Sequence, residues 1–166
     1  MGRFARLLHH WFAMPSRRLF SADSLARITA AIADGEQRHR GEVCFAVESA
    51  LGARQVLRGV DARTRAGEAF AALRVWDTAA NNGVLLYVLL ADHAIEIVAD
   101  RGLAGRVDEA QWRAICARME ERFRAGDHEG GAIAGIEAVS GLLATHFPQD
   151  GTQPDEDELP NRPHLL

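Results

Sequence analysis

The chain contains no lysine, so all nineteen of its basic residues are arginines. This absence excludes chemistry that needs a lysine amine, such as Schiff-base formation or phosphate binding by a P-loop lysine. Only two cysteines occur, Cys44 and Cys116, far apart in apolar stretches and without Cys-x-x-Cys spacing. They are expected to be buried thiols of a protein in a reducing compartment, and a zinc site or a disulfide framework is not expected.

Long apolar runs and an excess of positive charge are also missing. The longest apolar run, residues 84–91, has the length of a strand and falls short of the ~20 residues of a membrane helix. Arg6, His9, His10 and Pro15 interrupt the N-terminal apolar residues, which argues against a signal peptide. We therefore expect no transmembrane segment and a cytoplasmic protein, at most peripheral to a membrane. The net charge of −4 argues against a nucleic-acid partner.

The composition is that of one folded domain with extensions at both ends. The chain has 166 residues, of which 48% are hydrophobic, enough for a core that needs no metal or disulfide. We expect an N-terminal arm over residues 1–20, an α/β domain over 21–147 and a disordered tail over 148–166. The tail is acidic and proline-bearing and has little apolar content, which is typical of disorder.

The arm could form a short amphipathic helix. Leu7, Leu8, Trp11 and Phe12 would line one face of it, with arginines around them. Two interpretations are open. The helix either packs on its own domain, or it docks on a membrane surface or on a membrane-associated protein.

Within the domain, periodicity and capping residues predict an α-β-α-β-β-α-α order. Strands are expected over residues 43–47, 84–90 and 95–99, whereas residues 50–62 carry little pattern. A parallel crossover joins the first two strands, and a hairpin adds an antiparallel third. The expected fold is a three-layer α/β/α sandwich on a small mixed sheet. The helices are expected from Ser21 or Asp23, over 64–76, from Asp108, and over 130–147.

The stretch from residue 76 to 103 carries the most specific pattern, because N-N-G-V-L-L, a short hairpin, I-E-I and an R-G-L turn follow one another. This succession resembles the signature of the TPM-domain family. Gly41–Val43 resembles the family's entry into its first strand, and residues 123–136 resemble its closing helix pair, so the resemblance covers about 21–147. The family is named for a thylakoid protein of photosystem II repair and has many bacterial members. The resemblance implies divalent-metal binding and acid phosphatase activity, which are associated with some members.

The expected topology also predicts a site. Residues 41–42, 77–83 and 100–102 should meet at one end of the sheet. Carboxylate and amide oxygens suit Ca²⁺ or Mg²⁺, and an arginine beside them could grip a phosphate or another anion. No organic cofactor is expected. The candidate metal ligands are Glu42, Asp77, Asn81, Asn82 and Asp100, and the candidate anion-binding residue is Arg101.

The same residues also allow structural roles. Asn82 would shape the turn, Asp77 would cap it, Asp100 would pair with Arg101, and Glu42 would be solvated. No serine, threonine or histidine has an evident catalytic partner, so no catalytic residue is assigned. Three functions are therefore considered: a binding or assembly module for a membrane-associated complex, a metal-dependent acid phosphatase, and a structural domain regulated through its acidic tail.

Overall fold

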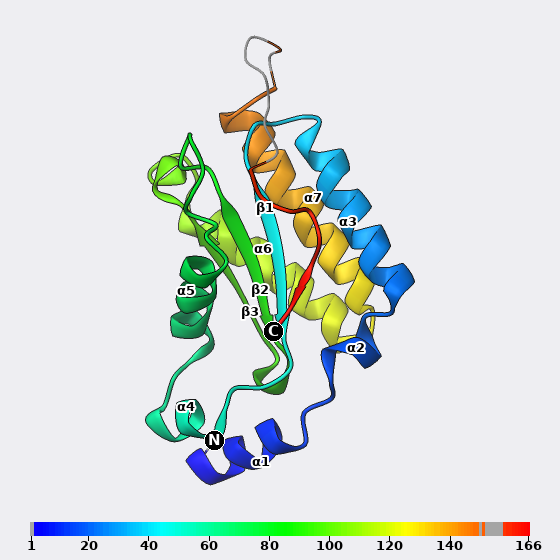
Figure 1. Cartoon of the computed structure of the whole chain (residues 1–166), viewed down its shortest axis with the longest axis vertical. Coiled ribbons are helices and arrows are strands. Elements are labelled where there is room, and N and C mark those ends of the chain that lie inside the picture. The colour runs from blue at the N-terminus through cyan, green and yellow to red at the C-terminus, as the bar shows by residue number, and fades with distance from the viewer. Residues whose placement is uncertain (1, 150, 152–157) are drawn as a thin grey trace.

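A computed structural model describes residues 2–149, 151 and 158–166. Figure 1 shows one open sheet with helices on both of its faces. The strands lie in the order β3-β2-β1-β4. The three-layer α/β/α arrangement predicted from the sequence is therefore confirmed.

Three of the strands form the predicted crossover and hairpin. β1 (Val43–Glu48) pairs in parallel with β2 (Val84–Leu89), with Val43 opposite Val84. β2 pairs antiparallel with β3 (Ala94–Ala99) across a 3-10 turn at Leu90–Asp92. A second 3-10 turn, Arg101–Leu103, follows β3.

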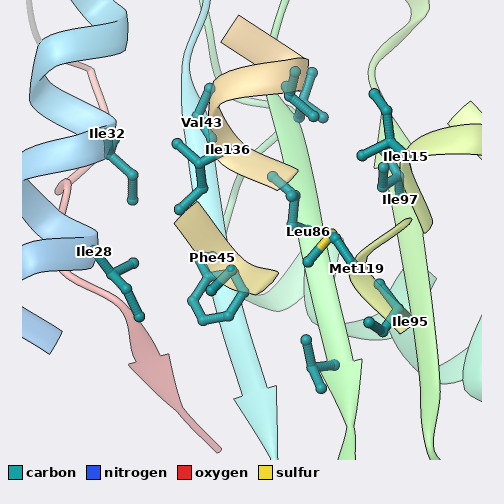
Figure 2. Close-up of a cluster of buried hydrophobic side chains, with 14 of the residues drawn as sticks. Ile28, Ile32, Val43, Phe45, Leu86, Ile95, Ile97, Ile115, Met119 and Ile136 are labelled. Carbon is teal, nitrogen blue, oxygen red and sulfur yellow. The ribbon is translucent and has the colours of Figure 1, made fainter. Parts of the chain in front are cut away.

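Three long helices cover one face of the sheet. They are α3 (Ala22–Glu36), α6 (Glu109–Arg124) and α7 (His128–His146). The helix caps follow the sequence, because Ser21 accepts a hydrogen bond from Ser24 N and Asp108 begins α6. Figure 2 shows the resulting core, to which the following residues contribute: Ile28 and Ile32 of α3, Val43 and Phe45 of β1, Leu86 of β2, Ile95 and Ile97 of β3, Ile115 and Met119 of α6, and Ile136 of α7.

A second, smaller core lies on the opposite face, under α5 (Ala62–Ala72) and α4 (Ala53–Arg58). Alternate residues of β2, among them Leu85 and Tyr87, point into it. All six residues of β2 are therefore buried. This double burial explains why β2 reads in the sequence as an unbroken apolar run rather than an alternating one.

The N-terminal elements differ from the predicted arm. α1 (Arg3–Trp11) is followed by a four-residue helix, α2 (Ser16–Leu19). Phe20 was assigned to the arm, but it is 1% exposed and packs edge-on against Phe45 at a ring-centroid distance of 6.0 Å. The folded core thus begins before residue 21.

The C-terminal residues 158–166 depart from the predicted disorder. Their strand β4 (His164–Leu165) pairs in parallel with β1. Leu159 is buried in the second core, and the Glu42 carboxylate accepts hydrogen bonds from the N–H groups of residues 158 and 159. A two-residue strand and one buried leucine leave no periodic pattern, which is why the sequence did not indicate them. The rest of the predicted tail beyond residue 149, apart from residue 151, lies outside the residues that the structure describes.

Among the helices described, none combines the length and the apolar character that crossing a membrane requires.

The turn before β2 depends on a glycine for space. A Cβ on Gly83 would lie 2.0 Å from the carbonyl oxygen of Val75, a backbone atom that cannot rotate away. The left-handed conformation in this turn belongs to Asn81 instead, with φ 52°.

We expect Gly83→Ala to lower the free energy of unfolding by about 2 kcal/mol or more, because the added methyl group overpacks a buried turn. The matched control is Gly67→Ala in α5, where nothing lies within 4 Å of an added Cβ. That exchange should raise stability by about 0.8 kcal/mol through helix propensity alone. Urea denaturation of both variants measures the difference, and equal stabilities would contradict the close approach at Gly83.

Candidate functional site

The three segments predicted to converge do meet at one end of the sheet. The backbone N–H of Val84 donates to the carbonyl of Glu42 at 2.8 Å, which joins the first segment to the second. Asp100 N donates to Gly83 O at 2.9 Å, and Gly102 N donates to Asn81 O at 2.8 Å. Backbone hydrogen bonds therefore fix the candidate residues near one another, whatever their side chains do.

Two side-chain oxygens at this end are buried and have no hydrogen-bond partner in the described residues: Asn82 Oδ1 and Asp100 Oδ2. Asn82 is 1% exposed, and its Nδ2 donates to Arg40 O at 2.6 Å. Asp100 Oδ1 accepts from the N–H of Arg101 at 2.7 Å and leaves Oδ2 without a donor. An unpaired buried oxygen costs about 1–3 kcal/mol. Asn82 Oδ1 and Asp100 Oδ2 are therefore the two buried oxygens of the predicted metal set that lack a donor in the described residues.

Asp77, Asn81 and Arg101 are engaged with protein partners. Asp77 is exposed and forms an ion pair with Arg74, three residues earlier. Asn81 Oδ1 accepts a hydrogen bond from Arg101 Nε at 2.9 Å. Arg101 itself is exposed. Arg101 therefore lies beside Asn81 at this end of the sheet. The Asp77 carboxylate instead pairs with Arg74 of its own turn.

Glu42 is buried rather than solvated. Its two carboxylate oxygens accept from Glu158 N at 3.2 Å and Leu159 N at 3.3 Å. The carboxylate of Glu158 in turn accepts from Ala79 N at 3.0 and 3.1 Å. The C-terminal segment is thus fastened to the candidate site by two carboxylates. No cluster of three or more His, Cys, Asp or Glu side chains suited to a metal ion occurs in the described part of the chain.

The opposite end of the sheet holds an unpredicted arrangement, in which the polar side of α1 faces the domain. Arg6 donates to both carboxylate oxygens of Asp92, at 3.1 and 2.7 Å, and to the carbonyl of Val60 at 2.7 Å. His10 Nε2 lies 3.0 Å from Asp92 Oδ1, and His10 Nδ1 accepts from Leu51 N at 2.9 Å. Burial raises the pKa of Asp92, but the bonds from Arg6 and His10 outweigh it, so the pKa lies below its usual value.

The apolar side of α1 and of the linker after it faces outward. Phe4 is 80% exposed, Trp11 77% and Phe12 78%. This reverses ordinary amphipathic packing, in which the apolar stripe is buried. Of the four residues predicted to share one face, only Leu7 turns toward the core, where it packs on the second cluster.

The residues near α1 add further exposed apolar side chains, together with arginines. α4 packs beside α1 (Figure 1) and exposes Leu57. The chain has no acidic residue over 2–22 or over 49–60. This apolar and basic surface, called here the α1 surface, consists of Phe4, Leu8, Trp11, Phe12, Met14 and Leu57 with the exposed arginines Arg17, Arg18, Arg54 and Arg58.

The anchor of α1 was missed in the sequence because Asp92 reads there as a hairpin-turn residue. The spacing of Arg6 and His10 was a usable signal, since residues four apart lie on one face of a helix. That the polar face and not the apolar face would be buried depends on a carboxylate more than eighty residues away. Helical periodicity does not reveal such a partner.

A sequence profile described as the TPM domain matches residues 15–142. Among solved structures, the NMR structure of the BA42 protein from the psychrophilic bacterium Bizionia argentinensis is similar, with 29% identity and a TM-score of 0.76. The similarity covers 89% of this chain and 95% of BA42.

A second similar structure is the N-terminal domain of the cg2496 protein from Corynebacterium glutamicum. It is 18% identical, with a TM-score of 0.55, over 82% of this chain and 78% of that domain, which shows a likeness of fold. No curated protein matches. The profile covers most of the chain, including the sheet end at Asn82 and Asp100. Because of this coverage, the chain belongs to the TPM-domain family.

Proposed function

We propose that this TPM domain is a binding module that attaches to an anionic membrane surface through the α1 surface. The observation that carries the proposal is the reversed orientation of α1: Arg6 and His10 are bonded inward to Asp92, while Phe4 and Trp11 point away from the domain. Phe4, Leu8 and Trp11 follow one another at spacings of four and three residues, so they share one exposed face of α1, and a large exposed apolar patch typically marks an interaction site.

Charge selects the occupant of this surface. Arginines surround the apolar residues, and acidic side chains are missing from both sequence segments that form the surface. The chain as a whole carries a net charge of −4, whereas residues 2–22 and 49–60 contain six arginines and no acidic residue. Each arginine near an anionic lipid surface contributes about 1 kcal/mol, and each buried aromatic or leucine side chain contributes about 1.5–3 kcal/mol.

The Asp92 anchor also lowers the cost of binding. Because Arg6, His10 and the Leu51 N–H already fix α1 in place, the helix need not form or orient when it meets a surface. Less ordering entropy is then lost on binding. The anchor therefore presents the apolar residues as a preformed surface.

We expect Trp11→Ala to weaken binding to vesicles that contain anionic phospholipid about tenfold or more, because an indole that would enter the interface is removed. Co-sedimentation with anionic and with zwitterionic vesicles measures the effect. The matched control is Trp76→Ala: Trp76 is 48% exposed but lies outside the α1 surface. Equal binding of the two variants, or no preference of the unmodified protein for anionic vesicles, would overturn the proposal.

As a second candidate function, we propose a divalent-cation site where β2 begins and β3 ends. Its support is the pair of buried oxygens without donors, Asn82 Oδ1 and Asp100 Oδ2. Oxygen ligands suit Ca²⁺ and Mg²⁺, which accept carbonyls and waters to complete their shells. If such a cation supplies Lewis-acid chemistry, Arg101 at the same end of the sheet would hold a phosphate oxygen, and the domain would act as a metal-dependent phosphatase.

We expect Ca²⁺ or Mg²⁺ to shift the amide NMR signals of residues 81–84 and 100–102, and Asp100→Asn to abolish these shifts by removing the charged ligand. Asp77→Asn serves as the control, since Asp77 is held in an exposed pair with Arg74, and its titration should match that of the unmodified protein. Unchanged signals at millimolar cation, or equal titrations of the two variants, would leave these residues with a structural role.

A further inference from the structure

A cavity of about 440 Å³ opens at the hairpin end of the sheet. It lies between the linker that follows α1, the end of β2, the start of β3, and the helices α6 and α7. Its volume falls within the ~300–1,000 Å³ of small-molecule sites. Most of its wall is apolar and comes from Phe12, Met14, Leu19, Val88, Ile95 and Phe123.

Four side chains in the cavity wall can donate hydrogen bonds. Arg124 and the imidazoles of His9, His93 and His128 line it. Glu120 is the acidic residue in the wall, and its carboxylate already accepts from Arg124 at 2.8 Å. An anion at this wall can therefore accept from Arg124, whose guanidinium also bonds Glu120, and from the imidazole nitrogens that carry a proton.

The three histidines lie on different parts of the cavity wall. His128 stands edge-on to Phe123, with ring centroids 5.1 Å apart, so it belongs to an aromatic part of the wall. His93 sits at the hairpin with a left-handed backbone, φ 50°, and is exposed, as is His9. The possible donors thus include exposed side chains on separate segments of the chain. They could bind the polar end of an amphipathic ligand while its apolar part lies on the apolar wall.

We propose that this cavity binds a small amphipathic monocarboxylate, a medium-chain fatty acid of about eight to ten carbons. The cavity of about 440 Å³ falls within the size range of small-molecule sites, which suits a molecule of this size and is too small for a full phospholipid. The carboxylate lies near Arg124, where it competes with Glu120, and the alkyl chain lies on the apolar wall. The inference does not depend on attachment to membranes.

The test uses octanoate as the probe and the whole chain without vesicles, so that its outcome is separate from that of the membrane experiment. Isothermal titration and amide NMR shifts follow the binding. We expect saturable one-to-one binding with shifts centred on residues 12–14, 88–95 and 120–128. Methyl octanoate, which has the same tail without the charge, should bind at least tenfold more weakly.

Two pairs of variants locate the ligand. Arg124→Gln should weaken octanoate binding about tenfold, whereas Arg118→Gln, an exposed position of the same helix outside the cavity wall, should leave it unchanged. Ala13 lies in the partly buried linker and lines the cavity, so a tryptophan side chain in Ala13→Trp should fill the cavity and abolish octanoate binding. Ala114→Trp, on the exposed side of α6, should leave octanoate binding unchanged. Circular dichroism checks that each variant is folded.

Three results would overturn the proposal. Octanoate that produces no saturable shifts shows that the cavity takes no such ligand. Equal affinity for octanoate and its methyl ester shows that the carboxylate is not recognised. Undiminished binding by a folded Ala13→Trp variant shows that the ligand sits elsewhere.

Discussion

The burial of β2 on both faces is the constraint on which the rest of the structure depends. Val84, Leu86 and Val88 belong to one core, and Leu85, Tyr87 and Leu89 belong to the other. Neither helical layer could be removed without exposing half of this strand to water, at a cost of about 1.5–3 kcal/mol for each large side chain. Both cores meet at β2, so this strand fixes where the two ends of the sheet lie relative to the helical layers.

The two ends of the sheet carry different side chains and therefore offer different chemistry. At the start of β2, turns joined by backbone hydrogen bonds hold Asn82 and Asp100 with oxygens that lack donors. At the other end, Asp92 fixes α1 with its aromatic residues outward, next to a cavity of mostly apolar lining. Polar contacts thus fix the backbone at both ends of the sheet. The groups left for a ligand are two oxygens without donors at one end, and exposed aromatic side chains and an apolar cavity at the other.

The sequence predicted the parts of the fold that depend on neighbouring residues and missed those that depend on distant ones. The unbroken apolar run of β2 and the capping residues Ser21 and Asp108 are local signals, and their elements were predicted correctly. α4 depends on the burial of Val56, β4 on the pairing with β1, and the orientation of α1 on Asp92. At the site, topology predicted which segments meet, but not that Glu42 would hold the C-terminal segment or that Asp77 would pair locally.

Groups of the same chain occupy part of the outer side of β1 and one carbonyl of the edge strand β3. On β1, the C-terminal strand β4 takes up part of the exposed ladder. On β3, the guanidinium of Arg63 donates to the carbonyl of Ile97 at 2.6 Å and lies 3.6 Å from the carboxylate of Glu96. Open strand edges template pairing between copies of a chain, so these contacts shorten the stretches of β1 and β3 to which a strand of a second copy could add.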